Sequence, residues 1–116
     1  YSIKIYISNK RKLNRGFMNV SITKKDSSVV VSIEGSVNTQ TAPQLDEEIK
    51  ASLEGAKEII LDFSKVDYIS SAGLRLILVY QNQMDACGGK MVVKDAIDEV
   101  KEIFDMTGFS SIINFV

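Results

Sequence analysis

Two adjacent serines lie at a change of pattern in the middle of the sequence. Ser70 and Ser71 fall between an apolar run at residues 59–63 and a longer one at residues 74–80. The first run is typical of a buried strand and the second of a helix, so the serines stand where a helix is expected to begin. Backbone N–H groups in the first turn of a helix lack partners and carry a partial positive charge. We therefore expect the chemistry of this protein to involve these hydroxyls. The plainer alternative is that one of them only caps the helix.

The composition excludes several common kinds of site. The chain of 116 residues contains no histidine and one cysteine, which rules out a Ser-His-Asp triad, a structural zinc site and an internal disulfide. A single cysteine fits a reducing cytoplasm, and the longest apolar run falls far short of a membrane span. No Walker loop or G-x-G-x-x-G pattern is present. The sequence thus favours a cytoplasmic binding module over an enzyme, with no metal or cofactor.

Charge is distributed unevenly along the chain. The first 17 residues contain five lysines and arginines and no acid, which leaves nine basic against 15 acidic residues, a net charge of −6, for residues 18–116. The basic segment is typical either of an arm that binds nucleic acid or a membrane, or of an extension that is disordered or not native. We expect the second, because regular patterning begins directly after Met18. The acidic excess of the remainder argues against nucleic acid as a partner.

The pattern after Met18 alternates strands with helices. Strands are predicted at residues 19–24, 28–34, 58–63 and 90–94, and residues 112–115 form either a last strand or an apolar tail. Apolar residues at helical spacing predict helices from Thr41 to about Gly55, at residues 74–87, and from Asp95 to about Gly108. The order β-β-α-β-α-β-α-β predicts one α/β domain, in which a hairpin precedes right-handed crossovers. The sheet is then mixed but mostly parallel, with helices packed on it.

Several residues carry helix-end signals. Thr41 and Gln44 have the spacing of a capping box, and Pro43 fits a first turn that needs no N–H donor. Asp95 is a candidate cap for the third helix. The helix that follows Leu74 is apolar nearly all round in its first half, so we expect it to be the most buried of the three.

Three stretches together carry a resemblance to a known family. They are residues 33–38 leading into 41–43, residues 60–66, and residues 68–74. In this order and at these spacings they resemble the STAS domain, named for sulfate transporters and anti-sigma factor antagonists. They are similar to its G-x-(L/V)-(D/N) element, its LDLS-x-V strand and its D-S-S-G-L loop. The resemblance covers residues 18–116 and implies one STAS domain, with a mixed, mostly parallel sheet of four to five strands.

The resemblance also implies which serine is modified. Setting Gly73 on the glycine of the family loop places Ser71 at its phosphorylated serine, Ser70 at its usual aspartate and Ala72 at its second serine. It therefore implies phosphorylation of Ser71, with Ser70 as the second choice, and a serine in place of the aspartate is a departure from the family pattern. A phosphate at a helix N-terminus adds roughly 1.5 to 2 negative charges where backbone donors accept them. The modified protein should therefore stay folded while its surface changes.

By the same resemblance, the partner-binding surface is expected around this loop. Its residues would be Asn38, Thr39, Tyr68, Ser70, Ser71, Ala72, Gly73 and Arg75. Asn38 and Thr39 have a plainer alternative role, which is to shape the loop before the first helix. Gly73 has the alternative of allowing close packing at a helix start, and Arg75 that of pairing with a local acid.

The family implies a binding module without catalytic residues of its own. The leading hypothesis is an anti-sigma factor antagonist. It would bind an anti-sigma factor that has serine kinase activity and belongs to the histidine-kinase-like ATPase family. Phosphorylation of Ser71 would switch it off, and a serine phosphatase would reverse the switch. The alternative is a non-switching accessory subunit of a lipid or anion transport system. Neither function requires a cofactor, a nucleic acid or a membrane segment in this chain.

Overall fold

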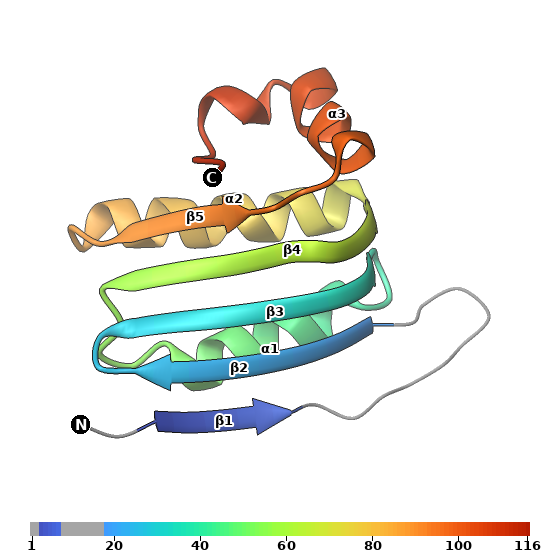
Figure 1. The fold of residues 1–116 in the computed structure, drawn as a ribbon. Helices are drawn as coiled ribbons and strands as arrows, with labels where there is room; N and C mark the ends of the chain where they lie inside the picture. The colour runs from blue at the N-terminus through green and yellow to red at the C-terminus, as the bar shows by residue number, and fades with distance from the viewer. Residues whose placement is uncertain (1–2, 8–17) are drawn as a thin grey trace.

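A five-stranded mixed sheet forms the centre of the fold (Figure 1). The computed structural model describes residues 3–7 and 18–116. Its elements are β1 (Ile3–Ile7), β2 (Met18–Lys25), β3 (Ser28–Val37), α1 (Ala42–Ser52), β4 (Glu58–Ile69), α2 (Ser71–Ala86), β5 (Lys90–Lys94), α3 (Asp98–Thr107) and the 3-10 helix η1 (Phe109–Ser111). The strand order is β1-β2-β3-β4-β5, with β1–β2 and β2–β3 antiparallel and β3–β4 and β4–β5 parallel. The predicted α/β class and its mixed sheet are confirmed.

β1 is a strand that the sequence did not predict. It pairs antiparallel with β2, with Ile3 opposite Lys25 and Ile7 opposite Ser21. The strand period is present in the alternation of isoleucine with Lys4 and Tyr6, but the basic residues around it favoured an extension. The rest of residues 1–17 lies outside the described part of the chain, so the expectation of a disordered or non-native extension stays a prediction there.

β4 is longer than the sequence predicts. It continues past Phe63 to Ile69 and remains paired with β3. Two register shifts, between Ser32 and Glu34 and between Gly35 and Ser36, absorb the extra residues of β4. Such bulges keep two strands together where their side-chain alternation slips. The sequence did not indicate this continuation because the residues of β4 after Phe63 are largely polar. The longer strand ends at Ile69, directly before Ser70.

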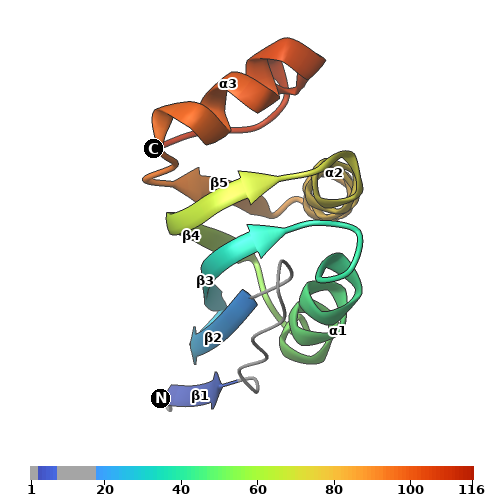
Figure 2. The same cartoon turned by 90° about the vertical axis from the view of Figure 1, so that its right-hand side faces the viewer.

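The helices α1 and α2 lie side by side on one face of the sheet, and α3 lies beyond β5 at the sheet edge (Figure 2). Under the two helices, every second strand residue is buried, as Val20 and Ile22 are in β2. The expectation that α2 is the most buried helix is confirmed, since it has six buried residues against four in α1 and two in α3. Leu74 and Ile77 are buried, but Val79 is 50% exposed, because a helix that lies on one face of a sheet turns its outer side to water.

Two predicted helix caps differ in the structure. Thr41 precedes α1 without a capping bond from its side chain. Its hydroxyl instead donates to the Ser36 carbonyl at 2.7 Å. The hydroxyl that a capping box would use therefore binds the preceding loop. Asp95 does not cap α3, which begins at Asp98 after Ile97. Asp95 adopts a left-handed φ of 59°, a conformation that aspartate tolerates better than most residues.

The C-terminal residues form a tail with one strand-like contact. Phe115 makes an isolated parallel bridge with Val93, and the Val93 N–H donates to the Asn114 carbonyl at 2.8 Å. The rings of Phe104 and Phe115 meet edge to face at 5.1 Å. Of the two sequence interpretations of residues 112–115, the structure supports the apolar tail.

Candidate functional site

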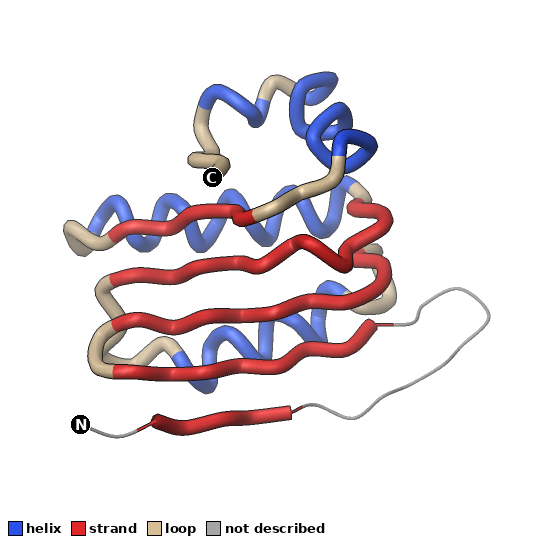
Figure 3. Tube along the Cα trace, viewed as in Figure 1, coloured by secondary structure: helices blue, strands red, loops and turns tan. Residues whose placement is uncertain are grey.

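The predicted site lies at one end of the sheet, where β3 and β4 both end (Figure 3). Because these two strands are parallel, the connections that follow them meet at the same sheet edge. The Ser70 N–H donates to the Val37 carbonyl at 2.8 Å and ties the two connections together. The loop at residues 38–41 and the start of α2 therefore form one surface.

Ser70 is the N-cap of α2. Its backbone is extended, with φ −92° and ψ 176°, and its Oγ accepts a hydrogen bond from the Gly73 N–H at 3.4 Å. The Leu74 N–H donates to the Ser70 carbonyl at 2.9 Å. The capping role is thus confirmed for Ser70. It also explains why α2 begins three residues before the predicted start at Leu74: the cap lies before the apolar pattern starts.

Ser71 is the first residue of α2 and is exposed. Its hydroxyl makes no hydrogen bond to the residues that the structure describes. The first N–H groups of a helix have no intrahelical acceptor, and the macrodipole favours an anion at this position. Of the two serines, Ser70 is therefore engaged in the fold, whereas the Ser71 hydroxyl is exposed and unbonded among the described residues.

Gly73 allows the start of α2 to sit close to β3 and β4. A Cβ atom at this position would lie 2.7 Å from Ile69 Cγ1, 2.8 Å from Val37 Cγ1 and 2.9 Å from the Val37 carbonyl oxygen. Atoms at these separations clash, and the last contact is with the backbone. The close-packing interpretation of Gly73 is confirmed, and this packing sets the position of Ser70 and Ser71.

Asn38 organises the loop between β3 and α1. Its Oδ1 accepts from the N–H groups of Gln40 at 2.9 Å and Thr41 at 3.1 Å, and its own N–H donates to Thr41 Oγ1 at 2.8 Å. An asparagine that bonds its own loop is a recurrent turn device. The loop-shaping alternative is therefore observed for Asn38, whereas Thr39 is exposed.

Tyr68 and Asp67 extend the same surface along β4. Tyr68 is 49% exposed, an unusual exposure for a large aromatic side chain, and it lies opposite Ser36 in the parallel register. The Ser36 hydroxyl donates to Asp67 Oδ1 at 2.8 Å. An exposed tyrosine beside a polar pair is typical of contact surfaces.

A shallow groove of about 320 Å³ runs between α1 and α2, next to Ser71. Its floor and walls are mostly apolar and are formed by Thr39, Ala42, Pro43, Asp46, Ala72, Arg75, Leu76 and Val79. Thr39, Ala72 and Arg75 were predicted site residues, whereas the others were not. The signal for the α2 wall was the i, i+3, i+4, i+7 spacing of residues 72, 75, 76 and 79; of these, the sequence argument placed only Ala72 and Arg75 on the partner-binding surface.

Of the two charged side chains in the groove, Asp46 has bonding partners and Arg75 has none among the described residues. Asp46 accepts from the Tyr80 hydroxyl at 2.5 Å and pairs with Lys50 at 3.6 Å. Burial, and then this hydrogen bond, raise the pKa of Tyr80 above its ordinary value of 10.0. The Arg75 guanidinium is exposed and makes no hydrogen bond or ion pair within residues 3–7 and 18–116. The local-acid alternative for Arg75 is therefore not what the structure shows.

Comparison with known families decides what kind of domain this is. The model of the STAS domain matches residues 19–116. The chain belongs to the STAS domain family. The match spans every element from β2 onward, so the loop, the groove and α2 are all parts of the STAS domain.

Two curated relatives are similar to this STAS domain over most of their length. BtrV of Bordetella bronchiseptica, which carries the name anti-sigma factor antagonist, is 35% identical over 96 residues, 82% of this chain and 83% of its own. The anti-sigma-B factor antagonist of Bacillus subtilis is 24% identical over 97 residues, 84% of this chain and 89% of its own.

Two solved structures support the fold. The anti-sigma factor antagonist SpoIIAA in its unphosphorylated form matches with a TM-score of 0.72 at 17% identity, over 84% of this chain and 87% of that one. Bacillus SpoIIAA in its phosphorylated form matches with a TM-score of 0.66 at 16% identity, over 84% and 90% of the two chains. At these identities the similarity establishes the STAS fold alone.

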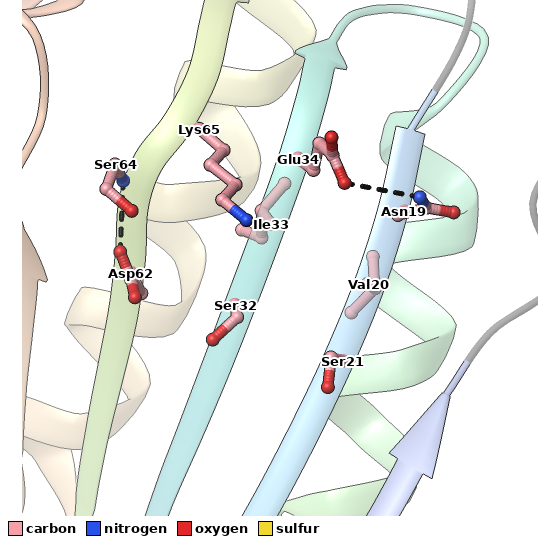
Figure 4. A pocket seen from close by; sticks show the side chains of 9 residues that line it. All are labelled: Asn19, Val20, Ser21, Ser32, Ile33, Glu34, Asp62, Ser64 and Lys65. Atoms are coloured by element: carbon pink, nitrogen blue, oxygen red, sulfur yellow. Dashed lines mark hydrogen bonds between the residues drawn. The ribbon is translucent and has the colours of Figure 1, made fainter.

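A second hollow, of about 330 Å³, lies on the sheet (Figure 4). Side chains of β2, β3 and β4 line it, and two hydrogen bonds join its members: Asn19 Nδ2 donates to Glu34 Oε1 at 3.3 Å, and the Ser64 N–H donates to Asp62 Oδ1 at 3.0 Å. Acidic, basic and hydroxyl groups are mixed there without converging on one chemistry.

Among the described residues, no three His, Cys, Asp or Glu side chains gather as a metal site would require. None of the described helices is long and apolar enough to cross a membrane.

Proposed function

We propose that this STAS domain is an anti-sigma factor antagonist that is switched off by phosphorylation of Ser71. It binds an anti-sigma factor in the cytoplasm and so releases the sigma factor that this partner holds. The observation that carries the proposal is the contrast between the serines: Ser70 caps α2, whereas Ser71 is exposed with an unbonded hydroxyl among the described groups. The names of BtrV and of the Bacillus subtilis relative support the partner class.

The modifying enzyme in this proposal is the anti-sigma factor itself, a serine kinase of the histidine-kinase-like ATPase family. The Ser71 Oγ attacks the γ-phosphorus of ATP, a new O–P bond forms, the bond to the β-phosphate oxygen breaks, and ADP leaves. The hydroxyl proton passes to a base on the kinase. A serine phosphatase reverses the change with water, which regenerates the hydroxyl and releases inorganic phosphate.

The helix start explains how the charge is tolerated in the folded protein. The phosphate brings roughly 1.5 to 2 negative charges to the N-terminus of α2, where the macrodipole and the first N–H groups favour an anion. Ser71 also directly precedes Ala72, which lines the groove, so a partner bound there would have to remove water from the same charge. A desolvated charge without a partner is costly in an interface. Phosphorylation therefore weakens binding without unfolding the domain.

The test is incubation with an anti-sigma factor kinase and MgATP, followed by mass spectrometry of the intact protein and its peptides. We expect one phosphoryl group, located on Ser71. The matched controls are Ser71→Ala, which should take none, and Ser70→Ala, which should lose about 1 kcal/mol of cap stabilisation and still be phosphorylated. An unmodified wild-type chain, or full modification of Ser71→Ala, would contradict the assignment. The first result would favour the non-switching accessory subunit.

A further inference from the structure

We propose that the groove between α1 and α2 receives an apolar segment of the anti-sigma factor that carries an acidic side chain for Arg75. We further propose that phosphorylated Ser71 competes for the same arginine. This inference rests on the proposed function and assigns the residue through which the modification reaches the docking surface. It has two parts. The first is what binds in the groove, and the second is that the Arg75 guanidinium pairs either with the carboxylate of the partner or with the phosphate on Ser71.

The groove presents apolar surface to water close to the modified serine. Leu76 and Val79 on α2 face Ala42 and Pro43 on α1 across a volume of about 320 Å³. Val79 is 50% exposed, although its side chain would be stabilised by burial. The space is near the lower end of the roughly 300–1,000 Å³ found for ligand pockets. It therefore suits one or two large side chains of a partner segment.

Charge decides which segment fits. Asp46 on the α1 side is already engaged by Tyr80 and Lys50. Arg75 on the α2 side has no such partner among the described residues, so it is the cation that the groove offers. A guanidinium binds a carboxylate through two parallel N–H···O bonds. The complementary occupant is therefore an apolar segment with an aspartate or glutamate.

Ser71 and Arg75 are placed to meet after modification. They are four residues apart on α2, and both are exposed. Residues at this spacing have Cβ atoms about 5–6 Å apart, and helical side chains lean toward the helix N-terminus, which brings the arginine side chain toward the turn of Ser71. Phosphate, like carboxylate, accepts the bidentate guanidinium fork, and it carries more charge than a carboxylate. Phosphoserine 71 therefore takes Arg75 from the acidic group of the partner.

The first experiment tests the contact inside the chain without any kinase. Phosphoserine is incorporated at position 71 during translation, in the wild type and in Arg75→Gln, and the melting temperatures of the four proteins with and without the phosphate are compared. In the wild type, we expect the phosphate to raise the melting temperature or leave it unchanged. In Arg75→Gln, we expect the phosphorylated protein to melt at a lower temperature than the unphosphorylated one. The control is Lys90→Gln, which removes an exposed cation opposite Glu58 at the start of β4, whereas Ser71 follows the end of that strand. An equal effect of the phosphate in all three backgrounds would overturn the contact.

The second experiment tests the sharing of Arg75 by calorimetric titration with the anti-sigma factor. We expect Arg75→Gln to weaken binding of the unphosphorylated chain roughly threefold to tenfold, and Arg75→Lys to weaken it less. The affinity ratio between unphosphorylated and phosphorylated chains should then be smaller in Arg75→Gln than in the wild type. Equal ratios would overturn the sharing. If the wild type itself does not bind, the proposed function fails, while the melting comparison still decides whether Arg75 holds the phosphate.

Discussion

At the scale of single residues, two neighbouring serines have different roles because the helix begins between them. Ser70 is extended and caps α2, whereas Ser71 is already helical and points to solvent. A sequence argument can place the pair at a helix start, but it cannot say which residue is the cap, since that depends on backbone angles at one position. The structure separates the two by a hydrogen bond from the Gly73 N–H to Ser70 Oγ.

The position of this pair depends on Gly73, and we expect Gly73→Ala to be strongly destabilising. The added methyl would lie within 3 Å of Ile69 Cγ1 and of the Val37 carbonyl oxygen, so the helix start must move. Overpacking of this kind costs typically about 1–3 kcal/mol, which urea denaturation can measure. Ser71→Ala, on the exposed neighbour, is the matched control and should change the free energy of unfolding by less than about 0.5 kcal/mol. A Gly73→Ala protein as stable as that control would contradict the close packing.

At the scale of elements, α1 and α2 are joined by a polar contact at one end of the groove. Tyr80 is buried, and its hydroxyl donates to Asp46 on α1. The aromatic ring adds to the core under α2 while the hydroxyl reaches the groove. The sequence predicted that α2 would be the most buried helix, but it indicated neither this link nor the partly exposed strip at Leu76 and Val79.

The raised pKa of Tyr80 makes the stability of the fold depend on alkaline pH. In the unfolded chain the phenol ionises near its ordinary value of 10.0, and in the folded protein it ionises above it. The folded state therefore holds the proton longer, so the contribution of Tyr80 is complete below pH 10 and is lost as the pH rises above it. We expect the stability difference between wild type and Tyr80→Phe to shrink between pH 8 and pH 11 in urea denaturation. A difference between wild type and Tyr80→Phe that stays constant over this pH range would refute the link.

The exposed strip of α2 should contribute to binding and little to stability. Val79→Asn removes an apolar groove residue that is 50% exposed, and valine and asparagine have similar helix propensities. We expect roughly tenfold weaker binding to the anti-sigma factor in calorimetric titration, with a free energy of unfolding within about 1 kcal/mol of wild type. Asn82→Ala, at an exposed α2 position outside the groove, should bind normally. Unchanged affinity of Val79→Asn would remove the groove from the interface.

At the scale of the whole molecule, the elements after Met18 form the STAS domain, and β1 is added at its edge. Their order followed from hydrophobic periodicity, because alternating and helical spacings are properties of the sequence itself. β4 could not be predicted to its end, since its last residues are held by pairing across two register shifts with β3. The groove could not be predicted either, because it depends on the distance between two helices far apart in the sequence.

We expect a chain that begins at Met18 to fold without residues 1–17. The buried core includes Met18 and the strands that follow, and the family match begins at residue 19. Loss of the β1 pairing should lower the melting temperature by no more than roughly 10 °C, with an unchanged circular dichroism spectrum and unchanged phosphorylation of Ser71. A shortened chain that is unfolded or cannot be phosphorylated would show that the N-terminal segment belongs to the domain.

The most direct test of the account is the affinity of the anti-sigma factor for the chain in two forms, with serine or phosphoserine at position 71. Both forms are measured by calorimetric titration against the same partner, and their circular dichroism spectra are compared. We expect the serine form to bind and the phosphoserine form to bind at least about tenfold more weakly, a difference of roughly 1.4 kcal/mol, with the same spectrum. Equal affinities of the two forms would contradict the switch at Ser71.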